Sequence, residues 1–277
     1  MKIALIQQHC STDKNENIAR GLAAVDAAAA QGARLVCFAE LAFERFYPQR
    51  PAAASPLQLA EPVPGPLTSA FAERARRHGL VIVLNLYERD GASAYDCSPV
   101  IDADGRLLGR TRMIHITDYA CFHEQGYYTP GDMGAPVYDT KAGRLGVAIC
   151  YDRHYPEYMR ALAIAGADLV VVPQAGAVGE WPEGLYEAEM RVAAFQNGYY
   201  VALCNRVGEE ECLTFSGESF VSAPDGRVIA RAPALQDSIL YVDVDLAETE
   251  RSHARQLFLR DRRPELYASW IAPAVVR

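Results

Sequence analysis

The chain has no run of roughly 18 uninterrupted apolar residues, the length that a helix needs to cross the apolar core of a bilayer. Its opening, MKIALIQQHC, turns polar too soon for a secretory signal peptide. Basic residues are also outnumbered, because 27 Lys and Arg stand against 35 Asp and Glu, and the net charge is -8. Nucleic acids and anionic membrane surfaces both require a basic face. We therefore expect no nucleic-acid partner and no membrane partner.

Cysteine shows no metal-binding pattern. The seven cysteines are odd in number and have no metal-type pairing, which fits a reducing compartment. We therefore expect a cytoplasmic protein with no metal site and no cofactor. The place of Cys121 stays open. Five other cysteines are predicted to be core or strand thiols: Cys10, Cys37, Cys97, Cys204 and Cys212.

Half of the 277 residues are hydrophobic and 22% are charged, so the chain can bury one large core. Strand-like apolar runs alternate with helix-like runs, which is the pattern of an α/β protein. No internal repeat or linker divides the chain, and we expect a single domain over residues 1–277. Strands are expected at 2–7, 33–40, 80–88, 97–104, 144–150, 167–174, 199–208, 215–224 and 239–246, and helices at 15–33, 66–79, 156–167 and 183–198.

The segment 144–157 reads RLGVAICYDRHYPE, in which an apolar strand ends at Cys150 and the polar start of a helix follows. Asp152 suits a helix cap and Pro156 an early helical position. The partial positive charge of a helix N-terminus favours thiolate, and the free N–H groups there, that of Tyr151 first, can hold an oxyanion. Cys150 is therefore a candidate nucleophile. The alternative is a small apolar residue at a strand end, since buried unreactive cysteines are common.

Two glutamates stand in segments of similar form. The strand ARLVCFAE ends on Glu40, and the loop CFHEQGYYTPGD carries Glu124 among aromatic residues. A carboxylate at the end of a buried strand is costly unless it reacts or has a partner. Taken alone, Glu40 can be a general base or half of an ion pair, and Glu124 fits a solvated loop residue. The proline-rich stretch 47–67 is expected as a surface excursion that forms one wall of a site.

Together these segments resemble the nitrilase superfamily of carbon–nitrogen hydrolases over nearly the whole chain. The resemblance lies in KIALIQ, the Glu40 strand, DADGRLLGRTR, YYTPGD, GVAICYDRHYPE and RSHARQLFLRDRRPELY. The last of these is most like the branch of N-carbamoylputrescine amidases and related N-carbamoyl amide hydrolases. The resemblance implies a four-layer αββα sandwich, a homodimer or higher homo-oligomer, and a small amide or N-carbamoyl substrate. It also implies that Cys150 attacks the amide or nitrile carbon, that Glu40 is the general base and that Glu124 helps to place the substrate.

The catalytic lysine of that family has no counterpart here. In GRTRMIHI, Met113 stands where the lysine belongs, and the three lysines of the chain are at positions 2, 14 and 141. A thiolate flanked by two carboxylates without a cation concentrates negative charge. Either a glutamate then takes up a proton or the cysteine stays a thiol. His115 shares a side with Met113 on an extended segment and is a candidate oxyanion group, whereas Arg112 faces the other side. His115 also fits the histidine that accompanies the lysine in the family.

Clues to an anionic substrate lie just after the nucleophile. Arg153 and His154 resemble the basic pair found there in hydrolases of N-carbamoyl amino acids, where such a residue holds the substrate carboxylate. The planar fork of arginine is suited to binding both carboxylate oxygens. Arg153 can instead be a structural partner of Glu157 or Asp152.

A cationic substrate would instead need an acidic pocket. In the segment VGEWPEG, Glu180 and Glu183 are candidates for such a pocket, and Trp181 is a candidate apolar wall of the substrate site. The sequence leaves the choice between an anionic and a cationic substrate open.

Three functions stay open at this point. The first is a thiol hydrolase of amides or N-carbamoyl compounds that works through an acyl- or carbamoyl-enzyme on Cys150. The second is a ligand-binding or regulatory protein that lost efficient turnover with the lysine. The third is a thiol enzyme of altered chemistry, such as one that transfers an acyl group to an amine or one that attacks a more activated substrate and so needs less oxyanion support.

Overall fold

The computed structural model describes residues 1–53 and 56–271, and the strands in them form two large sheets and a short ribbon. The first sheet has the order β15-β1-β2-β3-β5-β4, and β6 pairs with β5. Its strands are β1 (Lys2–Gln7), β2 (Leu35–Phe38), β3 (Val81–Val83), β4 (Leu86–Asp90), β5 (Ser93–Ile101), β6 (Leu107–Arg112) and β15 (Ser238–Asp243). The second sheet, in the order β14-β13-β10-β9-β8-β7, consists of β7 (Val137–Thr140), β8 (Gly143–Val147), β9 (Leu169–Gln174), β10 (Tyr200–Asn205), β13 (Phe220–Ser222) and β14 (Val228–Arg231). The ribbon pairs β11 (Val207–Glu209) with β12 (Thr214–Ser216).

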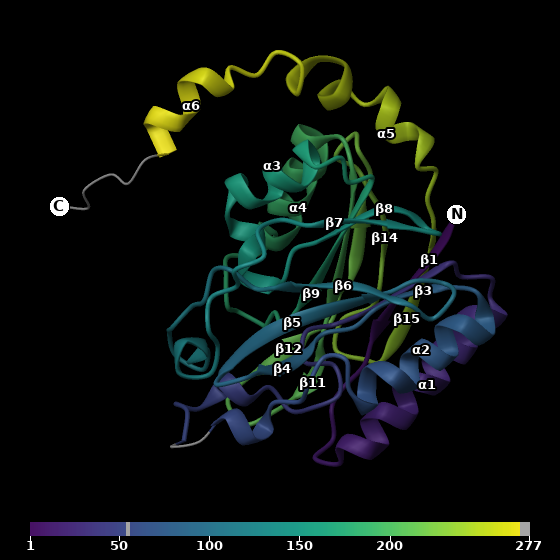
Figure 1. Ribbon diagram of the computed structural model, residues 1–277, viewed down its shortest axis with the longest axis vertical. Helices are drawn as coiled ribbons and strands as arrows, with labels where there is room; N and C mark the ends of the chain where they lie inside the picture. The colour runs from purple at the N-terminus through teal and green to yellow at the C-terminus, as the bar shows by residue number, and fades with distance from the viewer. Residues whose placement is uncertain (54–55, 272–277) are drawn as a thin grey trace.

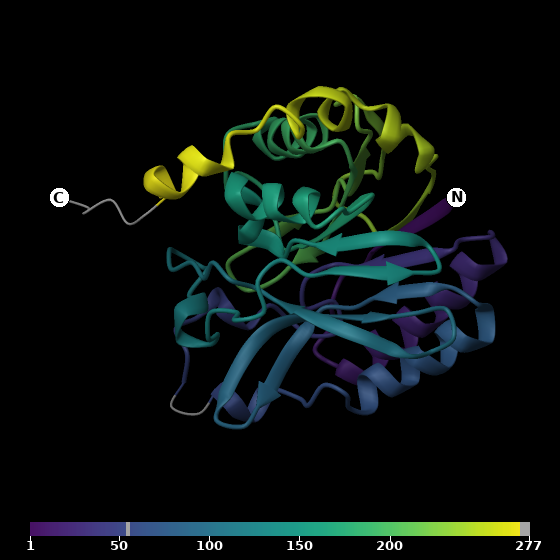
Figure 2. The same cartoon turned by 45° about the horizontal axis from the view of Figure 1, so that its top comes forward.

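The two sheets lie face to face, and a layer of helices covers the outer face of each (Figure 1 and Figure 2). Helices α1 (Lys14–Ala30) and α2 (Pro66–His78) cover the first sheet, whereas α3 (Pro156–Ile164) and α4 (Leu185–Asn197) cover the second. The chain then continues through α5 (Ala247–Arg251), a short π-helix (Ala254–Phe258) and α6 (Pro264–Ile271), which Figure 1 shows passing over the α3 and α4 layer. The four-layer αββα sandwich that the family resemblance implies is therefore confirmed.

The central strands are largely apolar because both of their faces are covered, and polar residues such as Gln174 stand at their ends. In β9, Leu169 and Val171 point into the core between the sheets, while Val170 and Val172 point toward α3 and α4. The strands β1, β2 and β3 run parallel to one another, and so do β8, β9 and β10. The carboxyl ends of β2 and β8 can therefore present functional groups at one edge of the sandwich.

The helix ends follow local chemistry. The Asp13 side chain accepts the main-chain N–H of Asn15 at 2.9 Å and so caps the start of α1. Helix α2 begins with Pro66 in its first turn and ends at Gly79, which takes the left-handed conformation (φ 64°) that glycine adopts at little cost. Both ends agree with the predicted helices to within a few residues.

The sequence prediction differs from the structure at several strands. The expected strand 80–88 is broken at Leu84 and Asn85 into β3 and β4, and the Asn85 side chain at the break binds the Leu41 N–H and the Asp96 carboxyl. The strands β6, β7 and β14 were not expected. They lie toward the sheet edges and many of their side chains are half-buried or exposed, so they lack the continuous apolar run of a central strand.

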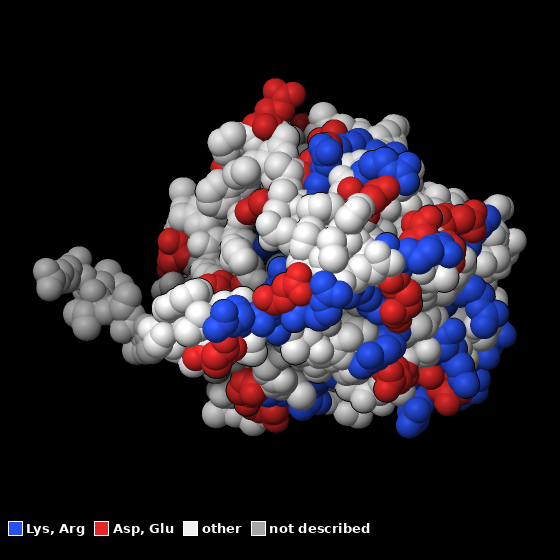
Figure 3. All heavy atoms as spheres, turned by 90° about the horizontal axis from the view of Figure 1, so that it is seen from above, with Lys and Arg blue, Asp and Glu red and all other residues white. Residues whose placement is uncertain are grey.

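The surface carries both signs of charge. On the face that bears the C-terminal segment, Lys and Arg side chains are interleaved with Asp and Glu (Figure 3). Within the described residues, the structure contains no helix with the length and hydropathy of a membrane span.

Candidate active site

Three buried residues from different parts of the chain meet at the edge of the sandwich. Glu40 follows β2, Cys150 follows β8 and opens the short 3-10 helix η4 (Cys150–His154), and Glu124 opens the 3-10 helix η3 (Glu124–Gly126). Both glutamates are fully buried and Cys150 is 6% exposed. The Cys150 thiol lies beside the Glu40 carboxyl, and Glu124 is near enough to affect the titration of both. The structure thus brings the three predicted residues together.

Cys150 sits on a sharp turn of the main chain. Its φ of 40° is in the left-handed region, which residues other than glycine rarely adopt. Arg153 holds this turn, since its Nη1 donates to the Cys150 carbonyl at 2.9 Å and to Gln174 Oε1 at 2.9 Å. Gln174 ends β9, so the ends of two neighbouring strands fix the position of the cysteine.

The main chain at Glu40 is held just as firmly. The buried guanidinium of Arg206 donates to the carbonyls of Glu40 and Leu41, and Asn85 accepts the Leu41 N–H at 2.7 Å. Within the described part of the chain, however, neither carboxylate oxygen of Glu40 receives a hydrogen bond of regular geometry. The side chain is therefore free to exchange a proton with a thiol, a water molecule or a ligand.

Sequence reasoning missed a third carboxyl group, that of Asp96 on β5. It is fully buried and lies beside Glu40, and its Oδ1 accepts Asn85 Nδ2 at 2.5 Å. The hydroxyl of Tyr128 is a second missed group, because it is buried near the same carboxyls. A signal for Asp96 was present: a carboxylate within the apolar run of a buried strand carries the same cost that drew attention to Glu40.

The carboxyls raise one another's proton affinity. Burial, followed by the Glu124 carboxyl, raises the pKa of Glu40 to about 8. Burial and Glu40 raise the pKa of Asp96 well above its ordinary range, and burial and Asp96 do the same for the pKa of Glu124. Burial and Glu40 also raise the pKa of the Cys150 thiol. The expectation that the helix start favours a resting thiolate is therefore wrong, since burial and the carboxyl groups outweigh it.

Met113 is fully buried in the core between the sheets, in the same apolar cluster as Cys150. Its N–H donates to the Asp96 carbonyl at 2.9 Å, and its carbonyl accepts the Gly131 N–H at 2.7 Å. A Cβ at Gly131 would lie 2.4 Å from the Arg112 carbonyl, so only glycine allows this close approach. Met113 thus lies between the Asp96 strand and the loop that follows Glu124.

The lysines of the chain lie away from this cluster. Lys14 pairs with Glu44 at 2.6 Å and with Glu61 at 2.9 Å, Lys2 lies 3.9 Å from Asp243, and Lys141 is exposed in a turn. That Met113 occupies the family's lysine position stays a prediction from the motif.

Arg112 is committed to a cluster of ion pairs. It binds Glu88 through two nitrogens at 2.8 and 2.9 Å and Asp90 at 2.6 Å, and its guanidinium lies over the Tyr95 ring. These contacts agree with the prediction that Arg112 faces away from the site.

The partly exposed His115 and the buried Asp152 link the Met113 segment to η4. His115 Nδ1 lies 2.7 Å from Asp152 Oδ1, and the imidazole stacks on Tyr155 with ring centroids 3.4 Å apart. The same carboxylate accepts the N–H groups of Ile114 and His115. The prediction that Asp152 caps the helix is therefore wrong, because the residue before α3 is Tyr155 and the Asp152 oxygens are turned to the other segment. The oxyanion roles of His115 and Tyr151 stay predictions.

Two of the residues predicted to bind substrate, Arg153 and His154, belong to η4. Arg153 is buried, its Nε lies 3.5 Å from Glu189 Oε2, and its guanidinium lies over the Tyr186 ring. The expected structural partners Glu157 and Asp152 are therefore replaced by Glu189. His154 Nδ1 lies 2.6 Å from Glu189 Oε1.

Trp181 packs against His154, with ring centroids 5.3 Å apart. Glu180 accepts hydrogen bonds from the hydroxyls of Tyr119 and Tyr186. Glu183 lines a cavity of about 330 Å³ together with Gln174 and Tyr186. Substrate binding by Arg153, His154 and Trp181 stays a prediction.

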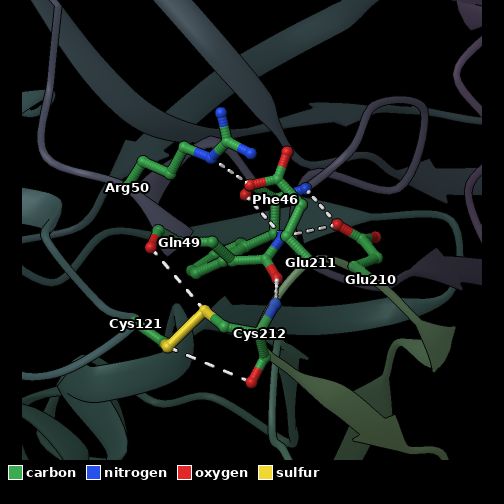
Figure 4. The surroundings of a disulfide bond; sticks show 7 residues. All are labelled: Phe46, Gln49, Arg50, Cys121, Glu210, Glu211 and Cys212. Atoms are coloured by element: carbon green, nitrogen blue, oxygen red, sulfur yellow. Dashed lines mark hydrogen bonds and ion pairs between the residues drawn. A yellow bond between two sulfur atoms is a disulfide. The ribbon is translucent and has the colours of Figure 1, made fainter.

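A disulfide joins Cys121 to Cys212 beside the loop that carries Glu124 (Figure 4). Cys212 is exposed between β11 and β12, so the expectation of a core or strand thiol at this position is wrong. The residues are 91 positions apart, and pairing at that distance leaves no local signal in the sequence. Disulfides are typical of oxidising compartments, which weighs against the cytoplasmic location that the cysteine pattern predicts.

The excursion that begins at Tyr47 is anchored beside this disulfide. Gln49, in the 3-10 helix η1 (Tyr47–Gln49), accepts the Cys212 N–H at 3.1 Å and donates to Glu210 at 2.8 Å, as Figure 4 shows. A second 3-10 helix, η2 (Pro56–Leu59), follows. Residues 54–55 of the expected wall lie outside the described residues.

Comparisons with known proteins agree with this geometry. A model of the carbon-nitrogen hydrolase family matches residues 2–254. The N-carbamoylputrescine amidase of Solanum lycopersicum is 33% identical to this chain and is aligned over 96% of it and 93% of its own length. The citrullinase of Francisella tularensis is 31% identical, with 96% of both proteins aligned.

Solved structures show the same fold. The carbon-nitrogen hydrolase from Helicobacter pylori G27 is 28% identical and superposes with a TM-score of 0.92 over 99% of both chains. A mutant of the amidase from Nesterenkonia sp. AN1 is 28% identical, with a TM-score of 0.81 over 98% of this chain and 97% of that chain. That structure shows covalent addition of the acetamide moiety of fluoroacetamide at the active site cysteine. From the family match, the relatives and the shared fold, it follows that the chain belongs to the carbon-nitrogen hydrolase family and is an enzyme.

Proposed function

We propose that the protein hydrolyses a carbon–nitrogen bond in a small amide or N-carbamoyl compound through a covalent intermediate on Cys150. One observation carries the proposal: the thiol lies beside the Glu40 carboxyl, whose two oxygens accept no regular hydrogen bond from any described residue. A nucleophile next to an unengaged base is the arrangement that covalent catalysis requires. The adduct on the cysteine of the Nesterenkonia amidase, within the same fold, supports it.

In the proposed mechanism, Glu40 takes the proton of the Cys150 thiol as the sulfur attacks the carbonyl carbon. The N–H of Tyr151 at the start of η4 would donate to the oxyanion that forms, and Glu124 would orient the substrate nitrogen. The protonated Glu40 then gives its proton to the leaving amine. Water loses a proton to Glu40, attacks the acyl or carbamoyl group and releases the thiolate, which recovers the proton.

The substrate class is best tested with a panel of acetamide, 3-ureidopropionate and a small nitrile. Release of ammonia from acetamide or 3-ureidopropionate supports the proposal. Ligand-induced thermal stabilisation without product or adduct would contradict it and favour a binding protein. A lasting adduct without product would favour acyl transfer. The N-carbamoyl compound in the name of the tomato relative supports including a ureido compound. Assembly as a homodimer or larger oligomer and a cytoplasmic location stay predictions.

Met113→Lys is expected to speed the hydrolysis of acetamide. The substitution places an ammonium on an unbranched stem of similar length in the segment that pairs with Asp96. A cation there would favour the ionised form of the carboxyls, and these would in turn keep it protonated. One oxyanion donor is typically worth about a hundredfold to a thousandfold in turnover, which sets the upper limit of the gain. The measurement is the rate of ammonia release, together with the rate at which iodoacetamide modifies Cys150 at neutral pH.

Met113→Gln serves as the matched control, since it has a similar length and no charge. If neither rate increases in Met113→Lys, the site does not lack a cation at this position. His115→Ala in the native background then separates two explanations. A collapse of activity would show that the histidine supplies the missing group, and unchanged activity would exclude it.

Arg153→Lys is expected to weaken the binding of ureido acids more than that of uncharged amides, because lysine keeps the charge but loses the two-pronged contact. An increase in KM of about tenfold corresponds to one lost hydrogen bond to a charged group. The measurement compares KM for 3-ureidopropionate with KM for acetamide in both proteins. Equal effects on the two substrates would show that Arg153 acts only by holding the Cys150 carbonyl.

A further inference from the structure

The carboxyls around Cys150 have more acceptor capacity than the protein uses. Both oxygens of Glu40, Oδ2 of Asp96 and Oε1 of Glu124 are buried, and none of them has a hydrogen bond of regular geometry with a described residue. Glu40 lies close enough to Asp96 and to the Cys150 thiol to share a proton with either. All three residues have less than 1% of their surface exposed. A buried carboxyl group whose oxygens lack hydrogen-bond donors is costly. Groups of this kind therefore indicate a ligand that supplies the missing donors.

Within the described residues, no Lys or Arg side chain forms an ion pair with these three carboxyls. Arg206 is close enough to affect the titration of Glu40, and Arg153 that of Cys150. Arg206 donates to the Glu40 carbonyl and to Glu210, whereas Arg153 donates through Nη1 to the Cys150 carbonyl and to Gln174, and its Nε lies 3.5 Å from Glu189. Met113, whose main-chain N–H donates to the Asp96 carbonyl, is uncharged and is buried in the core between the sheets. Carboxyl groups without a donor, next to an apolar residue, complement a ligand that brings its own positive charge, because a bound cation favours the ionised form of each carboxyl.

We propose that the reacting end of a substrate of this site is itself cationic, an amidinium or guanidinium group whose carbon is attacked by Cys150. The inference rests on the proposed role of Cys150 as nucleophile. A guanidinium is planar and carries N–H donors along its edges, so it can bind carboxylates through two parallel hydrogen bonds. Glu40, Asp96 and Glu124 offer the free oxygens for such bonds. A fixed lysine would repel the group, whereas Met113 does not.

The chemistry of such a substrate also removes the need for an oxyanion cation. When the Cys150 thiol gives its proton to Glu40 and the sulfur bonds to the guanidinium carbon, the electron pair of the C=N bond moves to nitrogen. The adduct is neutral. One nitrogen takes the proton from Glu40 and leaves as ammonia, so that a thiouronium cation stays on the sulfur.

Water then completes the reaction. It gives one proton to Glu40 and bonds to the thiouronium carbon, and the C–S bond breaks as the C=O bond forms. The hydroxyl proton passes to the released sulfur, and the proton on Glu40 joins the ammonia. The sum is guanidinium plus water giving a urea plus ammonium, with no oxidant, metal or cofactor.

A matched pair of substrates tests the proposal: 3-guanidinopropionate and 3-ureidopropionate share a carboxylate tail and differ only at the reacting carbon. Consumption of each and release of ammonia are measured for the wild type. We expect consumption of 3-guanidinopropionate, an inert Cys150→Ala protein, and a kcat/KM for the guanidine that falls about tenfold or more in Asp96→Asn, relative to the ureido compound. Met113→Lys should shift the ratio of the two kcat/KM values toward the ureido compound, and Met113→Gln should not.

The outcomes separate the two proposals. Hydrolysis of 3-ureidopropionate without any consumption of 3-guanidinopropionate overturns the cationic substrate and leaves the proposed function standing. Inertness toward both compounds and acetamide, with no adduct on Cys150, overturns both proposals. Because Asp96 is buried, circular dichroism must show that Asp96→Asn is folded. If Asp96→Asn is not folded, the comparison of Met113→Lys with Met113→Gln decides. If the ratio of the two kcat/KM values is the same in both variants, the cationic substrate is overturned.

Discussion

Cys150→Ala is expected to lower turnover by roughly four to six orders of magnitude while leaving a folded protein that still binds substrate. The loss follows from removing the nucleophile of a covalent catalyst, for which single knockouts reach about a millionfold. The fold should survive because the change removes only one sulfur atom from a small side chain. Steady-state ammonia release and circular dichroism measure the two effects.

Cys204→Ala is the matched control. Its thiol is also fully buried, but it lies within the core between the sheets, near the carbonyls of Ile6 and Cys37. This variant is expected to keep its activity. Turnover by Cys150→Ala at near the wild-type rate would rule out the covalent mechanism.

Glu40→Gln is expected to be nearly as harmful to turnover, since the amide keeps the shape of the side chain but cannot accept a proton. The same change should stabilise the protein at alkaline pH. The pKa of Glu40 is raised from 4.5 to about 8, so between these values the folded protein holds a proton that the unfolded chain has lost. The free energy of unfolding therefore falls as the pH rises through this window, and glutamine removes that loss.

Two pH series measure these effects. The thermal midpoint of Glu40→Gln at pH 9 should exceed that of the wild type by about 2–4 °C for each kcal/mol by which the substitution raises the free energy of unfolding. In the wild type, kcat/KM should rise with pH up to about 8, because Glu40 must lose its proton to act as a base. A variant that is less stable than the wild type at pH 9, or wild-type activity that is flat between pH 6 and 8, would contradict the assignment of Glu40 as the buried base.

The local sequence pattern was sufficient to predict the central strands and the candidate site residues at their ends. The strand β9, for example, is apolar from Leu169 to Pro173 because it is buried on both faces, and this run is visible in the sequence. Cys150 and Glu40 stood out because each interrupts such a run at its end. Edge strands such as β6 lack this signal, since much of their surface is half-buried.

Contacts between distant segments could not be read from local pattern. Asp152 fits a helix cap by its position, yet its carboxylate is used by His115, 37 residues earlier in the chain. Asp96 becomes part of the site only because β5 returns beside Glu40, and Cys121 meets Cys212 only when their two loops come together. In each case tertiary packing decides among partners that the sequence leaves equally available.

The central claim is that Cys150 carries the acyl group during hydrolysis. Its most direct test is peptide mass mapping of the wild type and of Cys150→Ala, each quenched during incubation with acetamide. The account predicts an acetyl group on the peptide that contains Cys150 in the wild type and no acetylated peptide in the variant. An acetyl group on a different residue, or hydrolysis by Cys150→Ala at the wild-type rate, would contradict it.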